Sequence, residues 1–69
     1  MALFSATRNH ATVTEVGVAE WNRIFWAKAQ NECGPDMLLA LEESWGYIED
    51  DRDEGKSPIE VLLAWGVEF

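Results

Sequence analysis

The stretch that decides the fold is residues 34–60, GPDMLLALEESWGYIEDDRDEGKSPIE. Its first three residues, GPD at 34–36, end one helix and begin another, because proline is preorganised for the first helical turn. Its last four residues, SPIE at 57–60, form a capping box with proline at the first helical position. In such a box the Ser57 hydroxyl accepts a hydrogen bond from the Glu60 N–H, and the Glu60 carboxylate accepts one from the Ser57 N–H.

Between these two signals the apolar side chains recur at intervals of three and four, so that they share one helical face. They are Leu38, Leu41, Trp45 and Ile48. This spacing predicts a second helix over about residues 36–51, although Gly46 weakens its middle by about 1 kcal/mol relative to alanine.

Similar patterns flank the central stretch. A first helix is expected over about residues 18–32, and a third from Pro58 to about Trp65, with Gly66 as its stop. Gly17 favours a start at residue 18, whereas a weaker capping box, TVTE at 12–15, would start the helix near Val13. The expected apolar residues are Val18, Trp21, Ile24, Phe25 and Ala29 in the first helix, and Ile59, Leu62, Leu63 and Trp65 in the third.

These signals predict an all-α fold, a compact three-helix unit in one domain of 69 residues with an irregular or partly helical N-terminal segment. An α+β fold is the alternative, because the β-branched residues at 12–16 could form a short strand paired with residues 67–69 or with a second subunit. Cys33 is the one cysteine, so no intramolecular disulfide can form. Stability must come from dense packing of the four tryptophans, from self-association, or from both.

The net charge of −8 falls entirely in the second half of the chain. Residues 1–35 carry three acids and three bases, whereas residues 36–69 carry ten acids against Arg52 and Lys56. Direct binding to nucleic acid or to an anionic membrane is disfavoured, because both need a basic surface, and a basic protein partner is favoured instead. No apolar stretch approaches the ~20 residues that a membrane-spanning helix needs. The lone cysteine and the lack of a signal peptide predict a cytoplasmic protein.

Candidate catalytic and metal-binding groups are sparse, which predicts a protein that is not an enzyme and needs no cofactor. Nucleophilic catalysis requires an oriented base, and a pair of His10 with Cys33 is less plausible than a surface histidine and a buried structural cysteine. Residues 49–60 resemble an EF-hand calcium loop in the placing of their acids. However, Glu54 stands where that loop needs glycine, and the capping box explains Glu60 better, so no metal site is expected.

An acidic face is the main candidate for a binding site. Glu43, Tyr47 and Asp50 would follow one another on the second helix, with Glu54 next, opposite its apolar face. Like charges at such spacings destabilise a helix by about 0.2–0.5 kcal/mol per pair, and a tolerated cost of this kind favours a binding role over a merely solvated face. Trp26 lies off the apolar stripe and is either a core contact or an exposed anchor. The candidate partner-binding residues are Glu42, Glu43, Tyr47, Glu49, Asp50, Asp51, Asp53, Glu54 and Trp26.

In length, acidity and lack of a catalytic constellation, the whole chain resembles small phage-encoded anti-defence proteins, a class that includes anti-CRISPR proteins, anti-restriction DNA mimics and uracil-DNA glycosylase inhibitors. The likeness is one of class, and no motif carries it. It implies a non-enzymatic inhibitor in the host cytoplasm that blocks nucleic-acid access to a bacterial defence or repair complex, foremost a CRISPR-type effector. Acidic side chains on a helix, with their Cβ atoms about 5–6 Å apart, would occupy a Lys/Arg groove in place of phosphates.

The alternative function is a protein–protein interaction or assembly subunit, such as a homodimer or an antitoxin-like chain, that uses an apolar surface around Trp26. The two functions predict different effects of substitutions. Reversing the charges of Glu43 and Asp50 should abolish binding in the first case, whereas Trp26→Ala should dissociate the assembly in the second.

Overall fold

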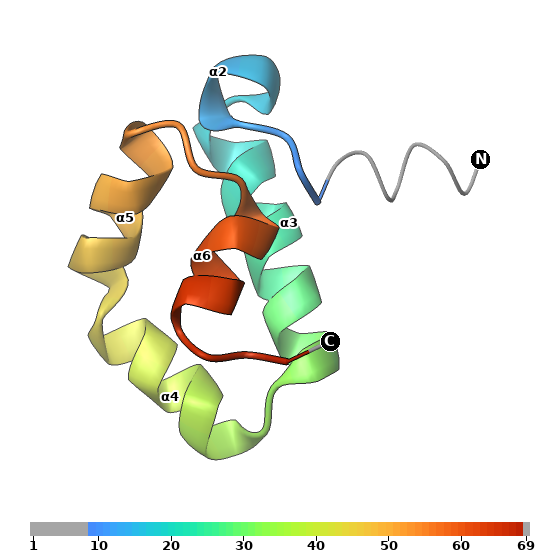
Figure 1. Ribbon diagram of the computed structural model, residues 1–69, viewed down its shortest axis with the longest axis vertical. Coiled ribbons are helices and arrows are strands. Elements are labelled where there is room, and N and C mark those ends of the chain that lie inside the picture. The colour runs from blue at the N-terminus through green and yellow to red at the C-terminus, as the bar shows by residue number, and fades with distance from the viewer. Residues whose placement is uncertain (1–8, 69) are drawn as a thin grey trace.

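The computed structural model describes residues 9–68, in which five helices follow one another without a strand. Figure 1 shows α4 and α5 as an arc that faces α3, with α6 in the space between them. The all-α prediction is therefore confirmed, with five helices in these residues where the sequence predicted three. The helices are α2 (Val13–Val16), α3 (Val18–Glu32), α4 (Pro35–Glu43), α5 (Trp45–Asp53) and α6 (Pro58–Ala64).

The first predicted helix has the expected bounds, and the segment before it is also helical. The TVTE capping box forms, with the Thr12 N–H donating to Glu15 Oε1 at 2.8 Å, and it starts the single turn of α2. Gly17 then separates α2 from α3 with φ 86° and ψ 163°, a conformation that is open almost only to glycine. The short strand proposed for residues 12–16 is therefore wrong, and residues 67–68 form none either. Residues 1–8 and 69 lie outside the described part of the chain.

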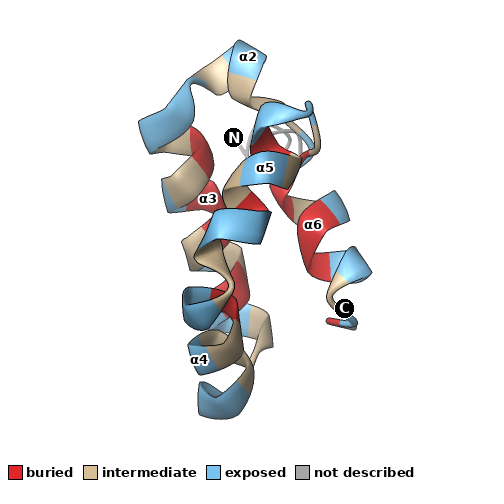
Figure 2. Cartoon of the chain, turned by 90° about the vertical axis from the view of Figure 1, so that its left-hand side faces the viewer, coloured by how far each residue is buried: buried red, intermediate tan, exposed pale blue. Residues whose placement is uncertain are grey.

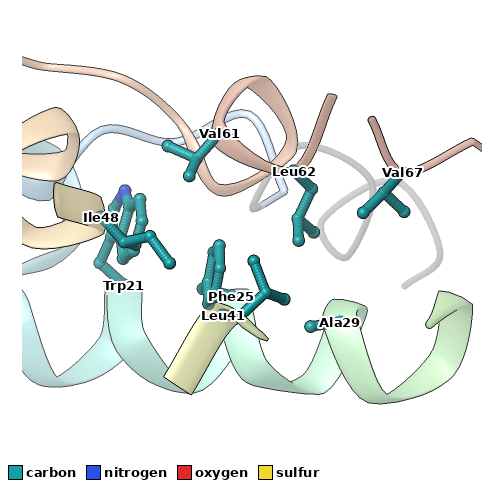
Figure 3. Close-up of a cluster of buried hydrophobic side chains, with 8 residues drawn as sticks. All are labelled: Trp21, Phe25, Ala29, Leu41, Ile48, Val61, Leu62 and Val67. Atoms are coloured by element: carbon teal, nitrogen blue, oxygen red, sulfur yellow. The ribbon is translucent and has the colours of Figure 1, made fainter. Parts of the chain in front are cut away.

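The core is one cluster of side chains from α3, α4, α5, α6 and the segment after α6. Figure 3 shows the side chains of α3 directed toward Val61 and Leu62 of α6. The indole N–H of Trp21, which is fully buried, donates to the Lys56 carbonyl at 3.0 Å and so ties α3 to the turn before α6. The cluster consists of Trp21, Phe25, Ala29, Leu41, Ile48, Val61, Leu62 and Val67.

Two predicted core residues are exposed. Val18 is 50% exposed because it is the first residue of α3 and stands at the edge of the cluster. Leu63 is 53% exposed. The short helix α6 turns only a narrow stripe of its surface toward the core, and Val61 and Leu62 form that stripe. The apolar pattern alone did not single out Val61, because α6 carries apolar residues on most of its surface.

The second predicted helix is broken into two, which corrects the expectation of a continuous helix over residues 36–51. Ser44 has φ −102° and ψ 17°, outside the regular helical values, and the Tyr47 N–H donates to the Ser44 carbonyl at 3.0 Å, three residues back. Serine and glycine close together are a common cause of such bends, and Gly46 stands two residues after Ser44. The bend allows α4 and α5 to curve around the core, so that both Leu41 and Ile48 are fully buried.

The last helix is fixed at both ends by the signals that the sequence predicted. Ser57 and Glu60 form the capping box, with the Glu60 N–H 3.3 Å from Ser57 Oγ and the Ser57 N–H 3.1 Å from Glu60 Oε1. At the other end Gly66 has φ 89°, and the Val67 N–H donates to the Leu62 carbonyl at 3.1 Å, as in a Schellman motif. This turn brings Val67 back into the core, where it is 6% exposed. Among the helices described, none is long and apolar enough to cross a membrane.

Candidate functional site

The predicted acidic residues separate into two groups according to their ion pairs. Three of them form ion pairs with two nearby basic residues. Arg52 Nε lies 3.0 Å from Asp53 Oδ1, and Arg52 Nη1 lies 3.7 Å from Glu49 Oε2. Asp51 Oδ1 lies 3.6 Å from Lys56 Nζ, at the end of α5. These three carboxylates therefore present less net charge to a partner than the sequence suggested.

The other predicted residues of this stretch are exposed, and their side chains form no ion pair within residues 9–68. Tyr47 stands among them with 74% of its surface exposed. We call this set the acidic outer surface, and Figure 2, which views the molecule from the side of α4 and α5, shows exposed residues along both helices. It consists of Glu42, Glu43, Tyr47, Asp50 and Glu54.

The bend at Ser44 divides this surface between two helices. Glu42 and Glu43 end α4, and no basic residue stands in the last turn of α4 to offset the negative end of its dipole. Tyr47 and Asp50 lie on α5, and Glu54 is its C-cap. The row expected on one straight helix is therefore divided between α4 and α5, the two helices of the arc in Figure 1.

Arg52, which interrupts the run of acids in the sequence, serves the fold instead. Its side chain is 7% exposed, and its Nη1 donates to Asn22 Oδ1 of α3 at 3.0 Å. The guanidinium thus links α5 to α3 while its stem is covered by the protein. This role could not be predicted from the sequence, because it depends on which residue of α3 faces α5.

Trp26 combines the two roles between which the sequence could not choose. Its indole stacks on that of Trp45, with ring centroids 5.3 Å apart and an angle of 29° between the planes. Both rings also contact Phe25, which is fully buried, at centroid distances of 5.2 and 5.7 Å. Trp26 is nevertheless only half-buried, so one part of it packs on the core and another part remains accessible.

The accessible part of Trp26 lines an open groove between α3 and the junction of α4 with α5. The groove encloses about 550 Å³, and it is mostly apolar with two polar side chains. One of these is Glu42 of the acidic outer surface, so the groove and that surface are continuous. The lining residues are Trp26, Gln30, Leu38, Glu42 and Trp45. Sequence spacing did not reveal this groove, because its walls come from three helices.

The other candidate groups do not form a reactive site in the described structure. His10 is exposed and Cys33 is half-buried, and no hydrogen bond joins them among residues 9–68. Burial raises the pKa of the Cys33 thiol, and the neighbouring Glu32 carboxylate raises it further, so the reactive thiolate is disfavoured. No group of three or more His, Cys, Asp or Glu side chains within residues 9–68 is arranged to hold a metal ion.

The geometry defines the chain as a small all-α protein with an acidic surface beside an aromatic groove. Comparison with protein-family models, with curated proteins and with solved structures gives no match to this chain.

Proposed function

We propose that the protein is a non-enzymatic inhibitor that binds a basic nucleic-acid-binding protein through its acidic outer surface and blocks access of nucleic acid. The target class that fits best is a bacterial defence or repair complex, foremost a CRISPR-type effector in the host cytoplasm. The observation that carries the proposal is the set of exposed carboxylates, Glu42, Glu43, Asp50 and Glu54, which form no ion pair within residues 9–68.

The arrangement of these carboxylates supports a role in binding. Arg52 and Lys56 offset two of the three charges of Glu49, Asp51 and Asp53. The four others are left uncompensated, two of them at the unfavourable end of α4. A surface of this kind attracts a basic partner over several ångströms and speeds its capture. It also competes directly with the phosphates of a nucleic acid for the same Lys and Arg side chains.

The experiment is affinity capture of partners from bacterial lysate at low and at high salt, followed by a nucleic-acid-binding assay of the captured protein. We expect a basic nucleic-acid-binding protein, lost at high salt because screening weakens exposed charge pairs, whose nucleic acid is displaced by this chain. The variant Glu43→Lys with Asp50→Lys should not capture it, and it should remain folded, because neither carboxylate has a partner within residues 9–68.

A matched control separates the position of the charge from its amount. The triple variant Ala19→Lys, Ala27→Lys and Glu68→Lys makes the same change in net charge at exposed positions outside α4 and α5. The proposal requires this control to retain far more binding than the double reversal. Equal loss in both variants would show that only the overall charge matters, and unchanged capture by the double reversal would refute the proposal.

The alternative function, assembly through an apolar surface, needs a different test from the Trp26→Ala variant that the sequence suggested. Trp26 packs on Phe25 and Trp45, so Trp26→Ala would disturb the core as well as a surface. Leu39 of α4 is 56% exposed and lies outside the core cluster, so Leu39→Gln tests a homodimer without that complication. A salt-resistant dimer that Leu39→Gln dissociates would favour the assembly function.

A further inference from the structure

We propose that the groove lined by Trp26 and Trp45 holds an arginine side chain of the basic partner protein, with Glu42 as its counter-ion. This inference rests on the proposed function and deepens it, because it distinguishes a specific anchor point from the rest of the acidic outer surface. The observation behind it is the placing of one uncompensated carboxylate at the edge of an aromatic groove.

The groove offers both kinds of contact that a guanidinium group uses. Its apolar wall consists of two indoles and Leu38, and a guanidinium stacks well on the face of an indole. Its polar edge carries the Glu42 carboxylate, which can accept two parallel N–H bonds from a guanidinium, and the Gln30 side chain, whose amide oxygen can accept another. The methylene stem of an arginine would lie along the same apolar wall.

The charge of the groove selects a cation as its occupant. Glu42 forms no ion pair within residues 9–68, and no Lys or Arg lines the groove. An anion or an acidic peptide would meet Glu42 and, beyond it, Glu43. An uncharged apolar segment would cover Glu42 without offering it a hydrogen bond, which is costly for a carboxylate. A basic side chain of a partner protein can pack on the indoles and form an ion pair with the carboxylate.

Arginine fits better than lysine for a geometric reason. The guanidinium is planar and weakly hydrated, so that it can stack on an indole and bond Glu42 at the same time. An ammonium group is compact and strongly hydrated, and its three donors do not match the two oxygens of one carboxylate. Trp26 and Trp45 are already held in place by Phe25, so little ordering is needed when the side chain enters.

The test uses a short arginine-rich peptide, blocked at both ends, and a lysine-rich peptide of the same length and charge spacing. Binding to the full chain is followed by nuclear magnetic resonance of the four tryptophan indole N–H groups. We expect the Trp26 and Trp45 signals to shift with the arginine peptide. The Trp21 signal should stay in place, because its indole N–H is buried and bonded to the Lys56 carbonyl. The lysine peptide should bind several-fold more weakly.

Two neighbouring variants make the matched comparison. Glu42→Gln and Glu43→Gln remove the same charge from adjacent exposed residues of α4, but only the first lines the groove. Glu42→Gln should weaken binding of the arginine peptide by about tenfold, because it removes a charge-assisted hydrogen bond. Glu43→Gln should weaken that binding by only about twofold.

The outcomes separate this inference from the proposed function. Equal effects of the two variants, or binding without a shift of the Trp26 and Trp45 signals, would overturn the arginine anchor and leave the acidic outer surface as the binding site. Failure of both peptides to bind at low salt would count against the anchor and the proposed function together.

Discussion

The bond between Arg52 and Asn22 gives the sharpest prediction about stability, because it joins α5 to α3 through a buried cation. Arg52→Met keeps much of the apolar stem but removes the guanidinium, whose Nη1 lies 3.0 Å from Asn22 Oδ1. A hydrogen bond to a charged group contributes about 1.5–3 kcal/mol when buried. Asn22 is half-buried and water can replace part of this bond, so we expect a loss of about 1.5–2 kcal/mol in the free energy of unfolding.

The ion pairs of Arg52 add little to that figure. The Asp53 and Glu49 side chains are 62% and 45% exposed, and exposed pairs contribute about 0–1 kcal/mol each. For a chain of this length the total stability is about 3–10 kcal/mol, so the loss is a large part of it. It corresponds to a fall of roughly 6–15 °C in Tm.

The assay is a double-mutant cycle with Arg52→Met and Asn22→Ala, followed by urea unfolding under circular dichroism. We expect a coupling free energy of about 1–1.5 kcal/mol, since each single variant already removes the shared bond. Arg23→Met is the matched control: Arg23 also bonds a neighbouring side chain, Glu20 at 2.8 Å, but it is 60% exposed. A coupling below about 0.3 kcal/mol, or an equal loss in Arg23→Met, would refute the reasoning.

Two further predictions concern the caps and breaks of the helices. Gly17→Ala should destabilise the protein by about 1–3 kcal/mol through backbone strain at φ 86°, whereas Gly46→Ala, within α5, should stabilise it by about 0.5–1 kcal/mol. Added methyl groups at both positions meet open space, so equal shifts in Tm would contradict this account. The hydrogen bonds from Ser57 lower the pKa of Glu60 from its ordinary value of 4.5. The Glu60 carboxylate therefore stabilises the folded state fully above about pH 4.5, and this stabilisation is lost as the pH falls through the lowered pKa. The difference in Tm between the wild type and Glu60→Gln should therefore shrink on acidification, and a constant difference would show that the carboxylate is not coupled to folding.

The candidate site could be predicted from the sequence only in part. The acidic stretch could be recognised in the sequence, because a run of charges depends only on the type and order of the residues. The sequence alone did not separate Glu42, Glu43, Asp50 and Glu54 from Glu49, Asp51 and Asp53, since that division depends on where Arg52 and Lys56 place their side chains. The groove could not be predicted either, because residues 26 and 45 meet only after α4 and α5 bend around the core.

The sequence by itself determined the features that local physical chemistry controls. The capping boxes at 12–15 and 57–60, the bounds of α3 and α6, and the all-α class follow from hydrogen bonds and apolar spacing within a few residues. Only the tertiary structure decided the bend at Ser44, the burial of Arg52 against Asn22 and the half-burial of Trp26. These features depend on contacts between distant segments, and such contacts can outweigh a local preference of about 1 kcal/mol per residue.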